Sequence, residues 1–330
     1  MKISVLGAGT WGTALAILLS NNGHKVVLWS KLQKEIDALK ENRSSIPNLP
    51  GAILPEEIEL SSCLQDAVAQ DPEIIVFAVA SPFTRETARS LAQYTKPGQV
   101  IVNVGKGIEE KTLFTLTDII SDEIPEADVA VLSGPSHAEE VIRQVPTLVT
   151  AASADPENAL LVQKIFMNKN FRVYTSSDVV GVELGGALKN VFAIAAGILD
   201  GMKLGDNPKA ALMTRGIHEM GNLGEMLGGE KSTFAGLSGV GDLIVTCCSG
   251  HSRNRHVGEE LGKGRKLPEI LKDMGMVVAE GVYTARGAFA LAKKAGADTP
   301  IINGIHAILY DSREVPQVID ELMTRAPKSE

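Results

Sequence analysis

The chain has 330 residues, of which 44% are hydrophobic, and its formal net charge is −8. This length is enough for a large buried core and favours roughly two domains. The negative charge excludes non-specific binding to nucleic acid or to an anionic membrane, because both need a basic surface. A bound anion therefore requires a local cluster of Lys or Arg.

Three cysteines, two of them adjacent at Cys247 and Cys248, form no disulfide framework and favour a reducing compartment. The first residues enter a strand and soon reach Gly7, which is not the pattern of a signal peptide. No uncharged apolar run reaches about 18 residues, so we expect no membrane span. These features together predict a soluble, cytoplasmic protein.

The first predicted strand, residues 2–6, runs into the glycine-rich sequence GAGTWG and then into an apolar helix. Strand, glycine loop and helix in this order are typical of a dinucleotide-binding site. Gly7 permits the tight turn, Gly9 lets the backbone approach a pyrophosphate, and Gly12 allows close packing of the helix on the sheet. Backbone N–H groups at the start of the helix then bind the diphosphate. A plain glycine-rich turn is the alternative interpretation.

The second predicted strand, residues 24–29, ends at Ser30 and Lys31. A site that prefers NAD usually has Asp or Glu about 20 residues past the glycines, where the carboxylate binds the adenosine ribose. Ser30 and Lys31 do not repel a 2′-phosphate, and Lys31 can attract one, so the sequence favours NADPH over NADH. Lys31 is alternatively the first residue of a solvated helix.

Further strands are predicted over residues 74–79, 100–104, 129–132, 146–152 and 171–175. Helices alternate with them, which predicts a parallel, doubly wound sheet of the Rossmann type within a first domain, residues 1–176. Ligands bind at the carboxyl ends of strands in such sheets. Lys106 and Ser136 follow two of these strands and are therefore candidate ligand-binding residues. Lys106 can also be an ordinary surface lysine in a turn.

From residue 177 onward every predicted element is helical, which gives a second, all-α domain over residues 177–330. Ser176 or Ser177 is the expected cap of a long helix that begins there.

Lys189 lies in an apolar stretch of this long helix. A lysine in such a place costs desolvation energy unless it is paired or needed for function. The neighbouring Asn190 favours a functional role, and so do Gly185 and Gly186, whose small size leaves room for a ligand. The alternative is a lysine whose ammonium group reaches the surface.

Polar residues recur later in the helical half. Asp242 stands between a glycine turn and an apolar run, which suits either a helix N-cap or a functional carboxylate. Arg253 and Asn254 are adjacent in a polar loop and suit the binding of a phosphate, or else form a solvated turn. Glu280 can bind a ribose or the nicotinamide amide, or serve as the acidic residue of a helix start. The histidines are scattered and the cysteines few, so we expect no metal site.

Several of these motifs together resemble one family. The motifs are GAGTWGTALA from Gly7, VGKGIE from Val104, LSGPSHAEE from Leu132, ELGGALKNVFAIAAGILDG from Glu183, LSGVGDLIVTC from Leu237, SRNR from Ser252 and VAEG from Val278. They are similar to those of bacterial NAD(P)-dependent glycerol-3-phosphate dehydrogenases, over essentially the whole chain. The resemblance implies a Rossmann domain followed by an all-helical domain, and commonly a cytoplasmic homodimer. It also implies reversible reduction of dihydroxyacetone phosphate to sn-glycerol 3-phosphate, which supplies glycerophospholipid synthesis.

The resemblance further implies contacts at residues whose chemistry alone does not single them out: Thr10, Trp11, Ala138 and Val278 at the cofactor, and Gly134 and Ser252 at the substrate. The full candidate cofactor-binding set is then Gly7, Gly9, Thr10, Trp11, Gly12, Ser30, Lys31, Lys106, Ala138, Arg253, Val278 and Glu280. The candidate substrate-binding set is Lys106, Gly134, Ser136, Lys189, Asp242, Ser252, Arg253 and Asn254.

Reduction of a ketone requires a proton for the carbonyl oxygen, and the resemblance implies that Lys189 transfers it. The apolar helix and the charge of Lys106 are expected to lower the pKa of Lys189, while Asp242 holds both ammonium groups in position. Lys189, Lys106 and Asp242 are therefore the candidate catalytic residues. Another two-domain dehydrogenase, acting on a hydroxy acid or sugar phosphate, remains an alternative. A non-catalytic dinucleotide sensor is a weaker one, because a sensor has no use for a buried lysine acid.

Overall fold

The computed structural model describes residues 1–44, 46, 49–275, 278–327 and 329. The chain divides into two compact units. The first unit comprises Met1–Lys106 and Phe114–Glu183, and the second comprises Gly107–Leu113 and Leu184–Glu330. The boundary between the units therefore lies inside a helix, after Glu183. The domain boundary at residue 176 stays a prediction from the sequence.

The first unit contains an eight-stranded sheet with the strand order β3-β2-β1-β4-β5-β6-β7-β8. Its strands are β1 (Lys2–Leu6), β2 (Lys25–Trp29), β3 (Glu59–Ser61), β4 (Ile74–Phe77), β5 (Val100–Asn103), β6 (Asp128–Ser133), β7 (Thr147–Ser153) and β8 (Phe171–Ser176). Among these described strands, every neighbouring pair is parallel except β6 and β7. The Rossmann-type fold class is confirmed, and the antiparallel pair departs from the expected all-parallel order.

The seven strands predicted from the sequence are present at closely similar bounds. The eighth, β3, was not predicted, because a strand of 3 residues is too short to show a periodic pattern. The continuous apolar run of β4 is buried along its whole length, as a central parallel strand requires. The strand order reverses between β1 and β4, so the carboxyl ends of these two strands form the usual ligand position of such a sheet.

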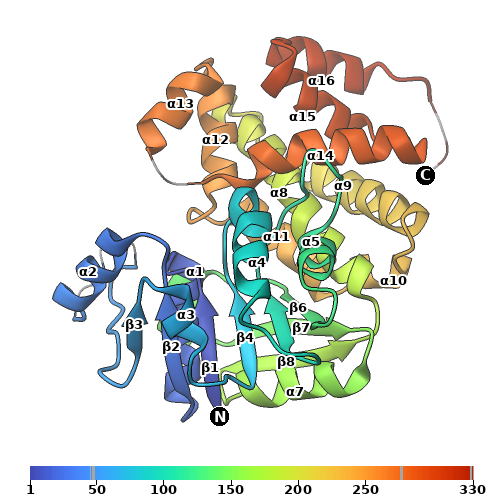
Figure 1. Ribbon diagram of the computed structural model, residues 1–330. Coiled ribbons are helices and arrows are strands. Elements are labelled where there is room, and N and C mark those ends of the chain that lie inside the picture. The colour runs from blue at the N-terminus through green and yellow to red at the C-terminus, as the bar shows by residue number, and fades with distance from the viewer. Residues whose placement is uncertain (45, 47–48, 276–277, 328, 330) are drawn as a thin grey trace. The chain divides into compact units, whose positions relative to one another are not determined.

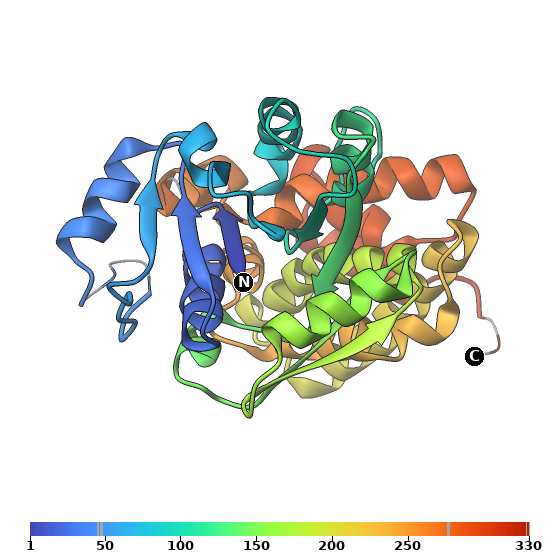
Figure 2. The same cartoon turned by 60° about the horizontal axis from the view of Figure 1, so that its bottom comes forward.

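Helices cover both faces of this sheet, as Figure 1 shows. They are α1 (Thr10–Asn21), α2 (Gln33–Glu41), α3 (Leu64–Val68), α4 (Thr84–Ala92), α5 (Leu116–Glu123), α6 (Ala138–Ile142) and α7 (Pro156–Phe166), with a 3₁₀ turn at Ser81–Phe83. One apolar core lies between the sheet and α1, α6 and α7, and a second lies between the sheet and α3, α4 and α5. In Figure 2 the light-green helix α7 lies beside β8, against which it packs.

The regular secondary structure of the second unit's described residues is helical. Its helices are α8 (Val179–Gly201, from Leu184 onward), α9 (Asp206–Met226), α10 (Lys231–Phe234), α11 (Asp242–Cys248), α12 (Arg253–Gly262), α13 (Leu267–Met274), α14 (Glu280–Ala295), α15 (Pro300–Tyr310) and α16 (Val315–Met323). A π-helical turn, Leu237–Gly241, leads directly into α11. The predicted all-α second part is confirmed.

Helix α8 is long and apolar enough to cross a membrane, but 89% of its most apolar window is buried inside the protein. The bent pair Lys231–Cys248 and Arg253–Gly262 passes the same test of length and composition when its two parts are taken together. The core helix of a globular protein passes this test as well. Because α8 also carries the buried polar residues Glu183 and Lys189, we assign it to the core.

The start of α8 corrects one expectation. The backbone N–H of Gly181 donates to the carboxylate of Asp178, 2.8 Å away, and the N–H of Asp178 donates to the hydroxyl of Ser176. Asp178, rather than Ser176 or Ser177, therefore caps the helix. A carboxylate is the better cap here, because its negative charge also interacts favourably with the helix N-terminus.

Candidate active site

The glycine loop follows β1 directly. Gly7 has a φ of +113°, which L side chains rarely adopt. A Cβ atom at Gly7 would lie 2.4 Å from the carbonyl oxygen of Ala78, and one at Gly12 would lie 1.9 Å from the carbonyl oxygen of Gly7. Both positions therefore require glycine, for the turn and for the close packing of α1.

Gly9 differs from these two glycines. A Cβ atom at Gly9 would meet nothing within 4 Å, so this position faces open space. Helix α1 begins at the next residue with no capping side chain and no acidic residue in its first turn. An open backbone position at a helix N-terminus fits a bound pyrophosphate, which backbone N–H groups and the helix dipole stabilise.

The turn after β2 holds more negative charge than the sequence indicated. The Ser30 hydroxyl donates to a carboxylate oxygen of Glu35, 2.5 Å away, and Lys31 forms an exposed ion pair with Glu86 at 2.5 Å. Glu35 also lines a pocket of about 90 Å³ together with Gly9 and other residues of the first unit. A carboxylate is thus present at this turn, supplied by α2 rather than by the end of β2.

Lys106, Gly134 and Ser136 come together at the carboxyl edge of the sheet. The Lys106 ammonium donates to the carbonyl oxygen of Gly134 at 3.1 Å, and the Ser136 hydroxyl donates to the same oxygen at 3.0 Å. Lys106 follows β5 and the other two follow β6, and these strands are neighbours. The first unit therefore presents a half-buried ammonium and a hydroxyl side by side, which suits the binding of an oxyanion.

In the second unit, Lys189 forms a buried ion pair with Asp242. The lysine Nζ atom lies 2.8 Å from Oδ1 of Asp242 and 2.5 Å from the hydroxyl oxygen of Thr246. Lys189, Asp242 and Thr246 are 6%, 1% and 3% exposed, respectively. Burial disfavours both charges, whereas their short separation favours them, so the pair persists only because each ion has the other.

The π-helical turn places Asp242 for this contact. Asp242 is the first residue of α11, and its carboxylate accepts a hydrogen bond from the Lys189 ammonium group. Helix α8 approaches the turn closely at Gly185, where a Cβ atom would lie 2.6 Å from the carbonyl oxygen of Ser238. The expectation that Gly185 leaves room for a ligand is therefore wrong, because the backbone of the π-helical turn fills that space. Such turns are frequent at functional sites.

Asn254 joins two other parts of the second unit. Its amide nitrogen donates to Oδ1 of Asn190 at 2.8 Å, and its amide oxygen accepts from the N–H of Gly281 at 2.9 Å. Asn254 is 8% exposed. It thus connects the residue after Lys189 to the start of α14, and half of its hydrogen-bonding capacity is already used within the protein.

The residues around Asn254 have different surroundings. Ser252 is buried and caps α12 by accepting from the N–H of Arg255. Arg253 is exposed at the first position of that helix. The two residues are adjacent in sequence, yet only Arg253 offers a charged group at the surface.

The remaining candidate cofactor residues lie at the ends of helices. Thr10 and Trp11 begin α1 and are half-buried, Ala138 is buried at the start of α6, and Glu280 is the first residue of α14. Val278 precedes α14 and is half-buried. Helix N-termini are favourable places for anions, which is consistent with a pyrophosphate ligand but is not specific for it.

Two polar residues of these clusters were not predicted. Thr246 stands four residues after Asp242 on one helix, a spacing that places both side chains on the same face and signals the contact. Asn103 is a fully buried polar residue at the end of an otherwise apolar strand. Its position three residues before Lys106 could have indicated a role in positioning that lysine.

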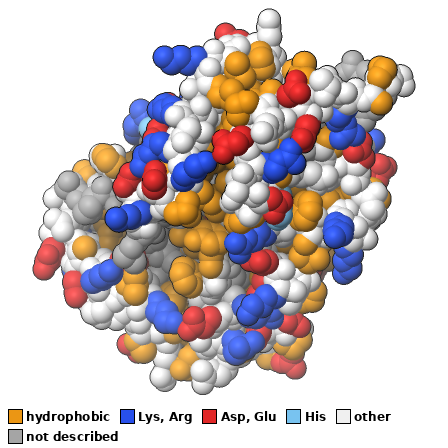
Figure 3. All heavy atoms as spheres, turned by 90° about the horizontal axis from the view of Figure 1, so that it is seen from above, with side chains coloured by type: hydrophobic (Ala, Val, Ile, Leu, Met, Phe, Trp, Pro, Cys, Tyr) orange, Lys and Arg blue, Asp and Glu red, His pale blue; other side chains and the backbone are white. Residues whose placement is uncertain are grey.

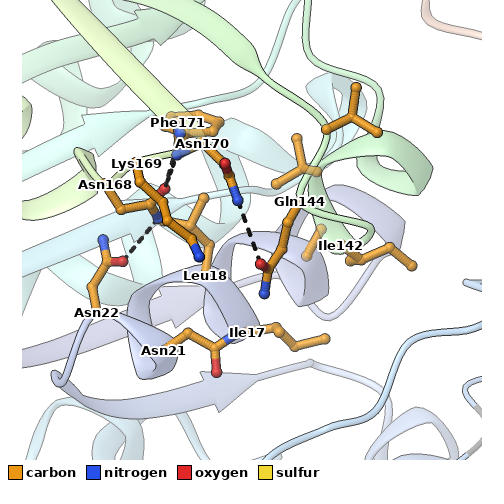
Figure 4. Close-up of a pocket in the computed structure, with 13 residues that line it drawn as sticks. Ile17, Leu18, Asn21, Asn22, Ile142, Gln144, Asn168, Lys169, Asn170 and Phe171 are labelled. Carbon is orange, nitrogen blue, oxygen red and sulfur yellow. Dashed lines mark hydrogen bonds between the residues drawn. The ribbon is translucent and has the colours of Figure 1, made fainter.

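One pocket of the first unit lies away from the glycine loop. Its volume is about 300 Å³, and it lies at the opposite end of α1, as Figure 4 shows. Side-chain amides such as Asn22 and Asn168 bind one another at its rim. Among the described residues, no group of three or more His, Cys, Asp or Glu side chains could hold a metal ion.

Basic side chains are not gathered on the face in Figure 3. Among the residues described there, Lys and Arg alternate with Asp and Glu. A nucleic acid or anionic membrane binds to a field of one sign, and this face does not present one.

Comparisons with known proteins cover the whole chain. The family model for the NAD-dependent glycerol-3-phosphate dehydrogenase N-terminus matches residues 2–159, and the model for its C-terminus matches residues 178–320. A glycerol-3-phosphate dehydrogenase of Fusobacterium nucleatum that uses NAD(P)+ is 52% identical over 100% of this chain and 98% of its own length. A second one, of Agathobacter rectalis, is 49% identical over 100% and 97%. The crystal structure of glycerol-3-phosphate dehydrogenase from Coxiella burnetii has a TM-score of 0.94 at 36% identity, over 98% of this chain and 99% of that one.

Proposed function

The chain belongs to the NAD-dependent glycerol-3-phosphate dehydrogenase family, and from this premise we propose that it reversibly reduces dihydroxyacetone phosphate to sn-glycerol 3-phosphate. It is an oxidoreductase that uses NAD(P)H. The observation that carries the proposal is the buried ion pair between Lys189 and Asp242 in a chain that also has a glycine loop for a dinucleotide. A ketone reductase needs both of these parts.

The glycine loop fits the cofactor. Gly9 faces open space beside the uncapped start of α1, and Gly7 and Gly12 keep the backbone close enough to form this cradle. We assign the pyrophosphate to this position and the adenosine ribose to the neighbouring turn at Ser30 and Lys31. When bound, the nicotinamide group supplies the hydride for the reaction.

Lys189 is the proposed proton donor. Negative charge develops on the carbonyl oxygen of the substrate during reduction, and an ammonium group stabilises that charge and then transfers a proton to it. Asp242 and Thr246 fix the direction of the ammonium group through contacts of 2.8 and 2.5 Å. Lys106 is a second ammonium that we assign to the substrate, held by the carbonyl oxygen of Gly134.

The substrate phosphate requires cations, because the protein as a whole is negatively charged. We assign the phosphate to Arg253, together with the N-terminus of α12 where this residue lies. Ser136 and Ser252 are further proposed substrate contacts. The proposed role of Asn254 is partly indirect, because its amide holds Asn190 and the Gly281 backbone.

The assembly and location of the protein follow from the family as proposals. We propose a cytoplasmic homodimer that supplies glycerol 3-phosphate for glycerophospholipid synthesis. Sedimentation velocity of the purified chain measures the first of these directly: a species of twice the 35.0 kDa chain mass is expected, and a monomer at micromolar concentration contradicts it.

The activity itself is tested by the oxidation of NADPH and NADH, followed by absorbance with a panel of ketones. Dihydroxyacetone phosphate is the expected substrate, and dihydroxyacetone without phosphate is the control that shows the contribution of the phosphate site. A chain that oxidises NADPH with a hydroxy-acid precursor but not with dihydroxyacetone phosphate contradicts the substrate. A chain that binds NADPH but reduces no ketone contradicts catalysis altogether.

A further inference from the structure

Asn103 binds both polar groups of the Gly105 backbone. Its amide oxygen accepts from the N–H of Gly105 at 3.0 Å, and its amide nitrogen donates to the carbonyl oxygen of Gly105 at 3.2 Å. Asn103 is the last residue of β5 and is fully buried. Lys106 follows Gly105 directly. The Asn103 side chain therefore fixes the position of the peptide group from which Lys106 extends.

Glu183 in turn binds Asn103. The amide nitrogen of Asn103 donates to Oε1 of Glu183 at 3.1 Å. The same oxygen accepts from the backbone N–H of Thr117 at 2.8 Å, and the Thr117 hydroxyl donates to the other carboxylate oxygen. Thr117 lies in the first turn of α5, where N–H groups have no partner within the helix. The buried carboxylate thus accepts hydrogen bonds from Thr117 and from Asn103.

We propose that Glu183 is a positioning residue for Lys106, acting through the side chain of Asn103 on the Gly105 backbone. The inference rests on the proposed function, because it matters only if Lys106 serves the substrate. Glu183 touches neither substrate nor cofactor in this proposal. Its carboxylate fixes which way the Asn103 amide faces, and the amide then fixes the peptide groups before Lys106.

The local sequence explains why such a support is needed. Lys106 stands between Gly105 and Gly107, and glycines leave the backbone many conformations. A larger residue at Gly105 would crowd its surroundings, because a Cβ atom there would lie 2.8 Å from a methyl group of Leu116 and 3.2 Å from the carbonyl oxygen of Val79. Side-chain hydrogen bonds to the backbone supply the order that the residue types do not, and they place the Lys106 ammonium on the Gly134 carbonyl oxygen.

The protonation state of Glu183 provides a second observable. Burial raises the pKa of this carboxyl to about 7, while the hydrogen bonds from Thr117 and Thr115 lower it and the charge of Asp118 raises it. A protonated carboxyl accepts fewer hydrogen bonds than a carboxylate, so the hold on Asn103 weakens as the pH falls through about 7. The turnover of the wild-type enzyme is therefore expected to decrease on that acid side.

The experiment compares Glu183→Met and Glu183→Gln, each alone and combined with Lys106→Ala. Glu183→Met is expected to lower kcat roughly 10- to 100-fold, as a small displacement of a catalytic group does. The dissociation constant of NADPH is expected to stay unchanged, because the glycine loop is intact. Glu183→Gln keeps the shape of the side chain, so it is expected to retain more of kcat than Glu183→Met and to lose the acid limb near pH 7.

The Lys106→Ala background separates positioning from general structural damage. If Glu183 acts through Lys106, Glu183→Met has no further effect on kcat once the lysine is removed. Equal fold-losses of kcat with and without Lys106 overturn the inference, and so does a Glu183→Met enzyme with wild-type turnover. If Glu183→Met does not fold, the same cycle is measured with Glu183→Gln, for which the expected loss is smaller but must again disappear in Lys106→Ala.

Glu219 offers a matched control. It is also a buried carboxylate that accepts backbone N–H groups, from Ile301 at 3.0 Å and Ile302 at 2.8 Å, and burial raises its pKa to about 7 as well. Glu219→Met is expected to lower the melting temperature, with kcat unchanged within about twofold. Failure of the wild-type protein to reduce dihydroxyacetone phosphate contradicts the proposed function instead, so the two failures are distinguishable.

Discussion

The candidate functional residues of the two units are built from different groups, backbone in the first and side chains in the second. In the first unit the glycine loop is made of backbone: Gly7 and Gly12 are required by packing, and Gly9 leaves open space at the start of a helix. In the second unit the corresponding element is a buried set of side chains, Lys189, Asp242 and Thr246. Gly7 and Gly12 therefore tolerate no added side-chain atom, whereas the buried side-chain set tolerates no loss of either charge.

The largest effect on kcat is expected when the positive charge of Lys189, in the second unit, is removed. Lys189→Met removes the proposed proton donor and is expected to lower kcat roughly 10²- to 10⁴-fold. It also removes the cation 2.8 Å from the buried carboxylate of Asp242, which costs about 3–5 kcal/mol of unfolding free energy. Circular dichroism and stopped-flow measurement of NADPH oxidation separate these two losses.

The double variant Lys189→Met/Asp242→Asn is the control for that loss. It removes both charges, so the stability is expected to recover in part while kcat stays low. A folded Lys189→Met enzyme with near wild-type turnover shows instead that Lys189 is a packing residue, and the contrast between the two units then disappears.

The second prediction concerns Gly12, in the glycine loop of the first unit. Gly12→Ala places a methyl group where the Gly7 carbonyl oxygen lies, so α1 must move away from the loop. Overpacking of this kind costs about 1–3 kcal/mol, which corresponds to roughly 10- to 100-fold weaker NADPH binding if the bound form requires the original geometry. Fluorescence titration with NADPH measures the effect.

Gly9→Ala tests separately whether the glycine loop binds the cofactor. Its methyl group would meet nothing within 4 Å, so the variant is expected to keep its melting temperature. Weaker NADPH binding without loss of stability then shows that Gly9 is needed for the approach of the cofactor. Unchanged binding in Gly9→Ala places the pyrophosphate elsewhere.

The glycine loop is easier to predict from the sequence than the buried side-chain contacts of the second unit. The tight turn at Gly7 and the close packing at Gly12 were predicted correctly, because their determinants lie within six neighbouring residues and the steric need for Gly12 is a local property. The contact between Lys189 and Asp242 joins residues 53 positions apart, and that between Asn190 and Asn254 joins residues 64 apart. Only the packing of helices brings such pairs together.

Gly185 shows the limit most clearly. A small residue beside a functional lysine admits either a ligand or a neighbouring backbone, and the sequence alone does not decide between them. Here the carbonyl of Ser238 occupies the space. The carboxylate of Glu35 at the Ser30 turn was missed for a related reason, because the usual rule considers only the end of β2 and not the helix that follows.

A third prediction concerns Arg253, an exposed cation of the second unit. Arg253→Ala is expected to raise KM for dihydroxyacetone phosphate roughly 10- to 100-fold, with a smaller effect on kcat, because a charged hydrogen bond contributes about 1.5–3 kcal/mol. Arg255→Ala is the matched control: it lies on the same helix, but its guanidinium binds Asp200 at 2.6 Å. An equal rise of KM in both variants shows that the helix as a whole, rather than Arg253, binds the phosphate.

The smallest effect is expected at the turn after β2, where the side chains of Lys31 and Glu86 are proposed to affect the choice between NADPH and NADH. Lys31 is the cation that can attract a 2′-phosphate, yet it is paired with Glu86 at 2.5 Å, and both side chains are exposed. An exposed pair contributes only about 0.2–1 kcal/mol, so Lys31→Ala is expected to lower kcat/KM for NADPH only a few-fold, and more at low salt than at high salt. Glu86→Gln has the opposite expected sign, because it releases Lys31 from its competing carboxylate and raises the ratio of kcat/KM for NADPH over NADH. If both variants leave that ratio unchanged, the turn does not select the cofactor. In that case Glu35, which receives the Ser30 hydroxyl at the same turn, is the group that meets the ribose.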